Sequence, residues 1–356
     1  MKNPFKYGTI VDDDFFTDRV RELAFVKQAM NSDNHLVLIS PRRFGKSSLI
    51  VKALKEIGRP YLILNLQRVI TVEDFASKLL REVFRLYPWE KVRHVMSHFR
   101  IVPTISTNPV TNGIDVSFQP TMDSSVMLED SIMLLERVSN EDRRLIVVFD
   151  EFQEIMSIGK GLDKQLRAIM QEQKGLNYIL LGSQESMMTE IFERKKSPFY
   201  HFGMLMRLDK IPYEDFFSYV EERLKPVTLD DCQAIVKEIL AITLCHPYYT
   251  QQLASQVWEL LYYEHIEDGV VEMAVERLVN IHDLDFERLW QNFNRTDKQI
   301  LFSLSSGQAP LQNRQVATST LFSSIKKLMK AGFVIRMDNY EIEDPFLKRW
   351  IKIKQG

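Results

Sequence analysis

The segment that most constrains this chain runs from residue 36 to residue 50. Residues 36–39, Leu-Val-Leu-Ile, form an apolar run typical of a buried strand, and an amphipathic helix begins near Lys46. The loop between them matches the phosphate-binding pattern G-x-x-x-x-G-K-[ST] except at its first position, which is Ser40. A strand, such a loop and a helix in this order predict an α/β fold that binds a phosphate group.

Each residue type in this loop suits a phosphate ligand. Gly45 permits close backbone approach, Lys46 can reach the β- and γ-phosphate oxygens, and the Ser47 hydroxyl can bind Mg²⁺. Free N–H groups at the start of the helix add the positive end of its dipole. The expected nucleotide-binding residues of the loop are Pro41, Arg42, Arg43, Phe44, Gly45, Lys46, Ser47 and Ser48.

A second apolar run, residues 145–149, ends in Asp150 and Glu151. Parallel sheets bind ligands at the carboxyl ends of their strands. We therefore expect Asp150 to help bind Mg²⁺ and Glu151 to orient or deprotonate an attacking water. A third apolar run ends at Ser183, which can bond the γ-phosphate or that water, or can simply be a turn residue.

Composition narrows the class of protein. The 356 residues carry a net charge of −2, with 45% hydrophobic and 26% charged residues, as in ordinary globular chains. Two cysteines favour a reducing, cytoplasmic setting, and no run approaches the ~20 apolar residues that cross a membrane. The first residues lack the apolar run of a signal peptide.

Three domains are expected. Strands alternate with helices through residue 209, which predicts a parallel sheet in a P-loop core, 1–209. Residues 210–292 read as helices only, one of them starting at a Thr228 cap, and form a helical lid domain. Residues 293–356 predict helix, helix, hairpin and helix, the outline of a winged helix.

Two features stay open at this stage. Turn signals and alternation around residues 100–120 predict an inserted β-hairpin, which is either a partner-docking element or a plain surface insertion. Residues 291–356 hold 11 Lys and Arg against 5 Asp and Glu, a net charge of +6. Such a winged helix suits DNA binding, or else protein contact.

Taken together, the chain resembles the prokaryotic (archaeal-type) ATPase family, an AAA+- and STAND-like branch of P-loop NTPases. The segments that carry the resemblance span nearly the whole chain: Asn3-Pro4-Phe5, Phe16-Thr17-Asp18-Arg19, the loop from Pro41 to Ser48, Phe149-Asp150-Glu151-Phe152, Gly182-Ser183, Ser197-Pro198-Phe199-Tyr200, His246-Pro247-Tyr248-Tyr249 and the stretch from Glu343 to Trp350.

The resemblance implies an AAA+-type sheet, a helical lid and a C-terminal winged helix that together bind ATP or ADP with Mg²⁺. It implies that Glu151 is the hydrolytic carboxylate, Ser183 the γ-phosphate sensor, and His246-Pro247 a lid motif at the nucleotide. Phe16 and Arg19 are expected beside the nucleotide too.

The chain departs from the family pattern at three places: Ser40, Cys245 and His201-Phe202 stand where the family has glycine, glycine and Gly-Arg. The last departure leaves Arg194 and Arg207 as candidates only for an arginine finger.

The leading hypothesis is a slow, Mg²⁺-dependent ATPase that acts as a nucleotide-driven switch with output through the winged helix. A homo-oligomer or a protein partner would supply the missing arginine. The alternative is a DNA-binding regulator or adaptor in which the nucleotide is structural. A P-loop kinase is a third interpretation, and the Asp-Glu strand end and the winged helix speak against it.

Overall fold

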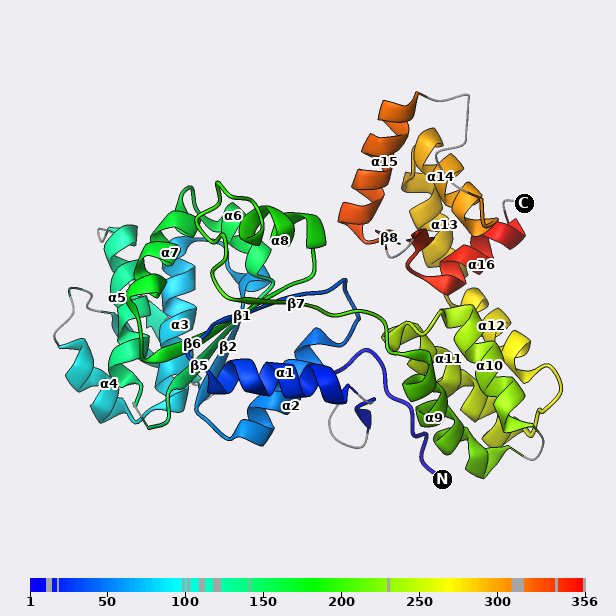
Figure 1. Cartoon of the computed structure of the whole chain (residues 1–356), viewed down its shortest axis with the longest axis horizontal. Coiled ribbons are helices and arrows are strands. Elements are labelled where there is room, and N and C mark those ends of the chain that lie inside the picture. Colours follow the sequence, from blue (N-terminus) through cyan, green and yellow to red (C-terminus); the bar gives the residue numbers. More distant parts are fainter. Residues whose placement is uncertain are drawn as a thin grey trace. The chain divides into compact units, whose positions relative to one another are not determined.

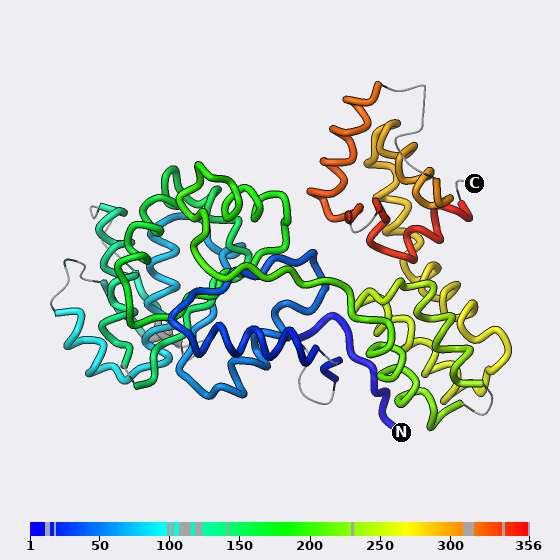
Figure 2. The backbone as a smooth tube through the Cα atoms, viewed as in Figure 1, coloured from blue at the N-terminus to red at the C-terminus, as the bar shows by residue number. Residues whose placement is uncertain are grey.

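The computed structural model of the chain describes residues 1–10, 15–17, 19–97, 100, 103–108, 113–117, 123–140, 142–228, 231–308, 317–336 and 339–354. The chain forms two compact units. The first unit contains residues 1–19, 41–48 and 209–356, and the second contains residues 20–40 and 49–208. The backbone therefore passes from one unit to the other four times along the sequence (Figure 2). The predicted three-domain division stays a prediction.

A five-stranded parallel sheet forms the centre of the second unit, in the order β2-β5-β6-β1-β7. Its strands are β1 (Leu36–Ile39), β2 (Tyr61–Asn65), β5 (Leu145–Asp150), β6 (Leu176–Gly182) and β7 (Met204–Arg207). Strand β1 lies between β6 and β7, and β6 separates it from β5. All five strands are parallel, so their carboxyl ends share one edge of the sheet. This confirms the predicted AAA+-type sheet.

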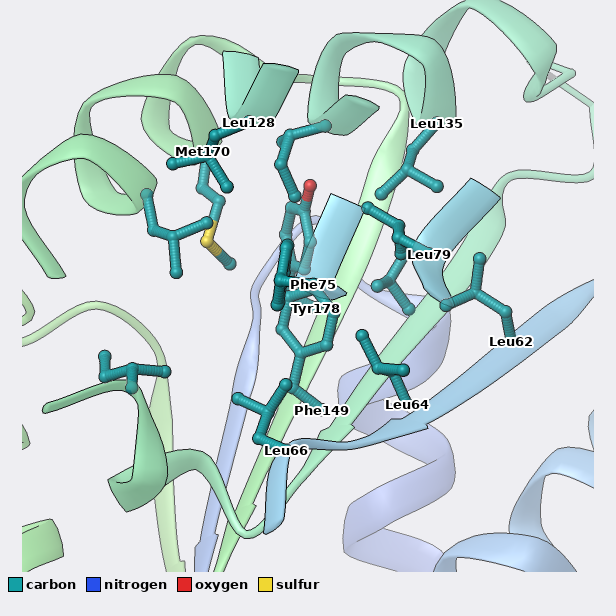
Figure 3. Packing of buried hydrophobic residues seen from close by; sticks show 14 of the residues in the cluster. Leu62, Leu64, Leu66, Phe75, Leu79, Leu128, Leu135, Phe149, Met170 and Tyr178 are labelled. Atoms are coloured by element: carbon teal, nitrogen blue, oxygen red, sulfur yellow. The ribbon is translucent and has the colours of Figure 1, made fainter. Parts of the chain in front are cut away.

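Helices cover both faces of this sheet (Figure 1). The helices between residues 20 and 192 are α1 (Val20–Asn31), α2 (Lys46–Ile57), α3 (Val72–Leu86), α4 (Trp89–Met96), α5 (Ser124–Val138), α6 (Ile155–Ile158), α7 (Leu162–Glu172) and α8 (Glu185–Phe192). Leucines of β2 and Phe149 of β5 pack against Phe75 of α3 and Leu128 of α5, with Tyr178 beside them (Figure 3). Each such side chain contributes about 1.5–3 kcal/mol by leaving water.

Local sequence features explain two helix ends and one hairpin. The Thr71 side chain accepts a hydrogen bond from the Asp74 N–H and starts α3, and α2 ends before Gly58, which has a φ of +66°. The predicted hairpin is present as β3 (Thr104–Asn108) paired with β4 (Gly113–Ser117). The turn residue Asn112 lies outside the described residues. Phe118, at the end of the predicted hairpin, lies outside them too. Helices α4, α6 and α8 and the edge strand β7 are short and were not predicted from the sequence.

The first unit is largely helical. Its elements are α9 (Tyr213–Leu224), α10 (Cys232–Thr243), α11 (Pro247–Glu259), α12 (Val270–Ile281), α13 (Asp283–Asn292), α14 (Arg295–Ser305), α15 (Thr318–Ala331), β8 (Val334–Arg336), β9 (Tyr340–Ile342) and α16 (Pro345–Lys354). From α14 onward these follow the order predicted for a winged helix, with β8 and β9 antiparallel. The N-terminal segment joins the same core through Phe5, and the Asn3 amide donates to the Ser255 hydroxyl at 2.9 Å.

The expected cap at Thr228 is wrong. Helix α10 begins at Cys232, and the Asp231 carboxylate accepts from the Ala234 N–H at 3.1 Å, so Asp231 is the cap. The Thr228 hydroxyl instead donates to the Leu224 carbonyl of the preceding helix. Among the described residues, none of the helices is both long and apolar enough to cross a membrane.

Candidate nucleotide-binding site

A cavity of about 520 Å³ opens over the start of α2, and all of its lining residues belong to the first unit. The loop contributes Arg43, Phe44, Gly45, Lys46, Ser47 and Ser48 to its wall. Helix α2 begins at Lys46, so the positive end of its dipole lies at this cavity. This is the environment that a chain of phosphates needs.

The loop backbone explains two of its residue types. Gly45 has a φ of +88° and Arg43 a φ of +64°, so the loop passes twice through the left-handed region. Ser40 is not among the residues with positive φ, and its N–H donates to the Gly182 carbonyl at 3.2 Å, extending the pairing of β1 with β6. Serine is therefore tolerated where the motif has its first glycine.

Part of the cavity wall is aromatic and comes from residues far away in the sequence. Tyr7, Phe15 and Phe16 of the N-terminal segment lie there with Pro247 and Tyr248 of α11. The rings of Tyr7 and Tyr248 meet edge to face, with centroids 5.7 Å apart. An apolar wall facing a phosphate-binding loop suits a nucleobase. Phe16 and Pro247 line the same cavity as the loop, and their contact with nucleotide stays a prediction; Tyr7 and Tyr248 were not predicted as ligand residues.

Arg19 also lines this cavity, but most of its side chain is buried. One guanidinium nitrogen donates to the Phe44 carbonyl at 3.1 Å and to the Asp209 carbonyl at 2.8 Å. These bonds tie the loop to the segment before α9. The geometry favours a role for Arg19 in holding the loop as well as in lining the cavity.

His246 is not among the residues that line this cavity, although it contacts two of them. Its Nδ1 accepts from the Tyr248 N–H at 3.2 Å and caps α11, and its ring packs against Phe44 with centroids 4.7 Å apart. Burial lowers the pKa of His246, while Glu343, 3.7 Å away, opposes that shift. The predicted direct contact of His246 with nucleotide stays a prediction. In the structure the His246 ring packs against Phe44. Pro41 is likewise absent from the residues that line the cavity.

The loop is joined to α11 by a second contact. The Arg43 guanidinium donates to the Tyr249 hydroxyl at 2.7 Å and lies 4.8 Å from the centre of the Tyr248 ring. Tyr249 is buried and contacts Phe346 of α16, with ring centroids 5.9 Å apart. Burial raises the pKa of the Tyr249 hydroxyl, and the nearby Asp344 and Glu343 carboxyls add to this. It is therefore a neutral donor and acceptor at any physiological pH.

A second cavity, of about 390 Å³, lies on the other side of this contact. Arg42 and Arg43 line it together with Tyr249, Glu343 and Asp344. Arg43 therefore borders both cavities, whereas Arg42 borders only the second. Among the predicted loop residues, Arg42 thus lies with C-terminal residues such as Glu343 and Asp344, and Phe44 to Ser48 lie at the first cavity.

The acidic residues predicted from β5 lie in the second unit, at the carboxyl edge of the sheet. Asp150 ends β5, and its Oδ1 accepts from the Glu151 N–H at 3.0 Å. Glu151 has a φ of +54° and a ψ of +49°, a conformation that non-glycine residues seldom adopt. Its Oε2 accepts from the Ser183 hydroxyl at 2.6 Å and from the Gln153 amide at 2.7 Å. The structure thus brings Ser183 to Glu151, and adds Gln153, which the sequence analysis did not select.

The other two departures from the family pattern carry backbone strain. Cys245 has a φ of +57° and His201 a φ of +55°, so each holds a left-handed conformation that glycine would adopt without strain. The two arginine-finger candidates form ion pairs on the surface, Arg194 with Glu190 and Arg207 with Glu193. Neither pairing selects one of them as a finger.

Comparisons with known proteins bear on the fold. No protein-family model matches the chain, and no curated protein does. Among solved structures, it is similar to a Walker-type ATPase of Pyrococcus abyssi, with 18% identity, a TM-score of 0.66, and coverage of 95% of this chain and 96% of that one.

Two Aeropyrum pernix structures are also similar. One is the ORC2 protein in ADPNP-ADP complexes, with 13% identity, a TM-score of 0.55, and coverage of 98% of this chain and 97% of that one. The other is the ORC1 protein in complex with DNA, with 12% identity, a TM-score of 0.52, and coverage of 96% and 94%. At these identities the likeness is one of fold. The chain therefore has the AAA+-type fold of Walker-type ATPases over nearly its whole length, which confirms the fold resemblance.

Proposed function

We propose that this protein is a Mg²⁺-dependent ATPase that acts as a nucleotide-driven switch. The observation that carries the proposal is a chain of contacts within the first unit. Phe44 packs on His246, and Arg43 bonds Tyr249, which in turn touches Phe346 of the winged helix. The side chains of Arg43 and Tyr249 thus connect the loop that would bind phosphates to the predicted output element.

The donor groups at the first cavity suit ATP. The Lys46 ammonium and the helix N–H groups would bind the phosphates, and the aromatic wall would hold the base. The Ser47 hydroxyl at the cavity and the Asp150 carboxylate at the end of β5 are the oxygen ligands that Mg²⁺ prefers. When bound, the ion would neutralise charge on the phosphate oxygens.

Hydrolysis needs a base, and Glu151 has that role in the proposal. A water oxygen would attack the γ-phosphorus, its proton would pass to the Glu151 carboxylate, and the bond to the β–γ bridging oxygen would break to release ADP. Without an arginine from a second subunit or partner, turnover should be slow, since such a finger is worth about 10³–10⁵ in rate. Loss of the γ-phosphate contacts at Lys46 and Ser183 would then release the lid.

The test is steady-state ATP hydrolysis with Mg²⁺ across a series of protein concentrations. Lys46→Ala and Glu151→Gln should abolish turnover, whereas Lys55→Ala, an exposed lysine on the same helix, should leave it unchanged. A rate per molecule that rises with concentration would support a finger supplied by a second copy. A wild type that retains nucleotide but does not turn it over would overturn the enzyme proposal.

A DNA-binding regulator is the second candidate, because Lys326, Lys327 and Lys330 are exposed on α15 of a segment with a net charge of +6. The ORC1 structure shows that a protein of this fold can hold DNA. Fluorescence anisotropy with duplex DNA at 50 and 200 mM salt would test this. Binding that weakens with salt and with Lys326→Ala and Lys330→Ala would support it, and no binding at 50 mM salt would exclude it.

A further inference from the structure

We infer that Gln153 is a positioning residue for ATP hydrolysis, which holds the Glu151 carboxylate in its working orientation. The inference rests on the proposed ATPase function and adds to it a residue outside the motifs that predicted the site. It begins from the turn that follows β5. Because Glu151 is left-handed, the chain reverses there into a short 3-10 helix, Phe152–Glu154.

This reversal places Gln153 back against the residue two positions before it. The Gln153 Nε2 donates to Glu151 Oε2 at 2.7 Å, a distance typical of a charge-assisted hydrogen bond. Phe152 anchors the turn, because it is fully buried and its ring contacts Phe199 with centroids 5.1 Å apart. The Gln153 amide is therefore presented by a fixed backbone and not by a mobile loop.

The two hydrogen bonds to Glu151 come from different elements. Gln153 approaches from the turn, and Ser183 approaches from the end of β6 with its hydroxyl 2.6 Å from the same Oε2. Both donors thus hold the same oxygen of the carboxylate. A base must be held within a fraction of an ångström of its productive position, so this restraint has value for catalysis.

The burial of Gln153 argues against a purely structural role. Its side chain is 1% exposed, and its Oε1 has no hydrogen-bond partner among the described residues. A buried carbonyl oxygen without a partner is destabilising, and a methionine of similar shape would avoid that loss. A residue kept for stability alone would not carry this group. The donor end of the amide, which touches Glu151, is the part that has a use.

The experiment compares Gln153→Met, which keeps the shape but removes the donor, with the wild-type full-length protein. We expect kcat to fall about tenfold to a hundredfold, because the Glu151 carboxylate is no longer held in its productive orientation. The affinity for ADP and the melting temperature should not fall. A structural role would give the opposite pattern, with a lower melting temperature and an unchanged kcat.

Gln153→Glu provides a second readout. The introduced carboxyl would lie against Glu151 and near Glu154, whose Oε1 is 3.5 Å from the Gln153 Nε2, and carboxyls this close share a proton at acidic pH. The shared proton restores a donor, so the kcat of this variant should recover as the pH falls, relative to that of wild type. The same kcat ratio to wild type at every pH would overturn the assignment.

A double-mutant cycle with Glu151→Gln keeps the inference testable apart from turnover. The unfolding equilibrium constants of the wild type, both single variants and the double variant measure the coupling of the two side chains. We expect a coupling of about tenfold or more, and a coupling below twofold would overturn the inference even in an active enzyme. A wild type without turnover but with strong coupling would instead overturn the proposed function, and the catalytic role of Gln153 with it.

Discussion

Phe44 is the side chain through which the phosphate-binding loop is anchored, so Phe44→Ala should weaken nucleotide binding as well as stability. The ring is fully buried in the first unit and packs on His246. It stands between Arg43 and Gly45, whose backbones are both left-handed. A loop with this backbone keeps its shape only while its surroundings hold it.

The magnitude has two parts. Removing a buried phenylalanine side chain costs about 3–5 kcal/mol of unfolding free energy. Without the anchor, two residues of the loop would have to be ordered again when nucleotide binds, at about 1–2 kcal/mol each. Binding of ADP should therefore weaken by about 2–4 kcal/mol, or roughly 30-fold to 1,000-fold.

The assay is an equilibrium titration with a fluorescent ADP derivative, together with thermal unfolding of each variant. Phe75→Ala is the matched control, because Phe75 is equally buried but belongs to the core of the second unit. It should lower the melting temperature to a similar degree and leave ADP binding unchanged. Phe44→Leu, which keeps part of the apolar contact, should fall between wild type and Phe44→Ala. If Phe44→Ala binds ADP as tightly as Phe75→Ala does, the anchoring argument is wrong.

Two further predictions concern pH. Burial, helped by the charge of Arg167, lowers the pKa of His35 to about 4, and its Nδ1 accepts from the Tyr178 N–H. The unfolded chain binds a proton near pH 6.5, so up to about 3 kcal/mol of stability present above that pH is lost as the pH falls towards 4. Chemical denaturation at several pH values in this range gives the free energy of unfolding as a function of pH. This free energy should change less with pH for His35→Asn than for wild type, and an equal change would refute the assignment. Burial of Asp297 in α14 acts to raise its pKa. The hydrogen bonds that its carboxylate accepts from Lys327 and Ser324 outweigh burial and lower the pKa of Asp297. Asp297→Asn should lower the free energy of unfolding by about 1.5–3 kcal/mol at neutral pH. This difference from wild type should shrink as the pH falls below about 4, through the pKa of Asp297 in the folded protein. A difference that stays constant down to pH 2 would contradict the prediction.

Strand and helix identities follow from the sequence wherever the signal is local. The apolar runs at residues 36–39 and 145–149 specify buried strands, and the helix that begins at Lys46 follows from its periodicity and its stop at Gly58. These signals need no knowledge of the rest of the chain. A short strand gives a weak local signal. The edge strand β7 was therefore not predicted, because it has only four residues and alternating burial.

Capping shows the limit of local signals. Thr228 and Asp231 are both good cap residues, and which of them begins α10 depends on the preceding helix. The Leu224 carbonyl at its end accepts the Thr228 hydroxyl, which leaves Asp231 to cap. A three-residue ambiguity of this kind cannot be resolved without the neighbouring element.

The sequence by itself predicts the phosphate-binding candidates Lys46 and Ser47 and determines the acidic strand end at Glu151, because each residue sits in a short pattern with its own physical reason. Only the tertiary structure brought Tyr248 of α11 to the loop, more than 200 residues away in the chain, and Gln153 to Glu151. The contact of Tyr248 with the loop depends on the packing of a helical core. The contact of Gln153 with Glu151 depends on the left-handed backbone of Glu151. Neither leaves a periodic trace in the sequence, since both arise from how separate or reversed segments pack.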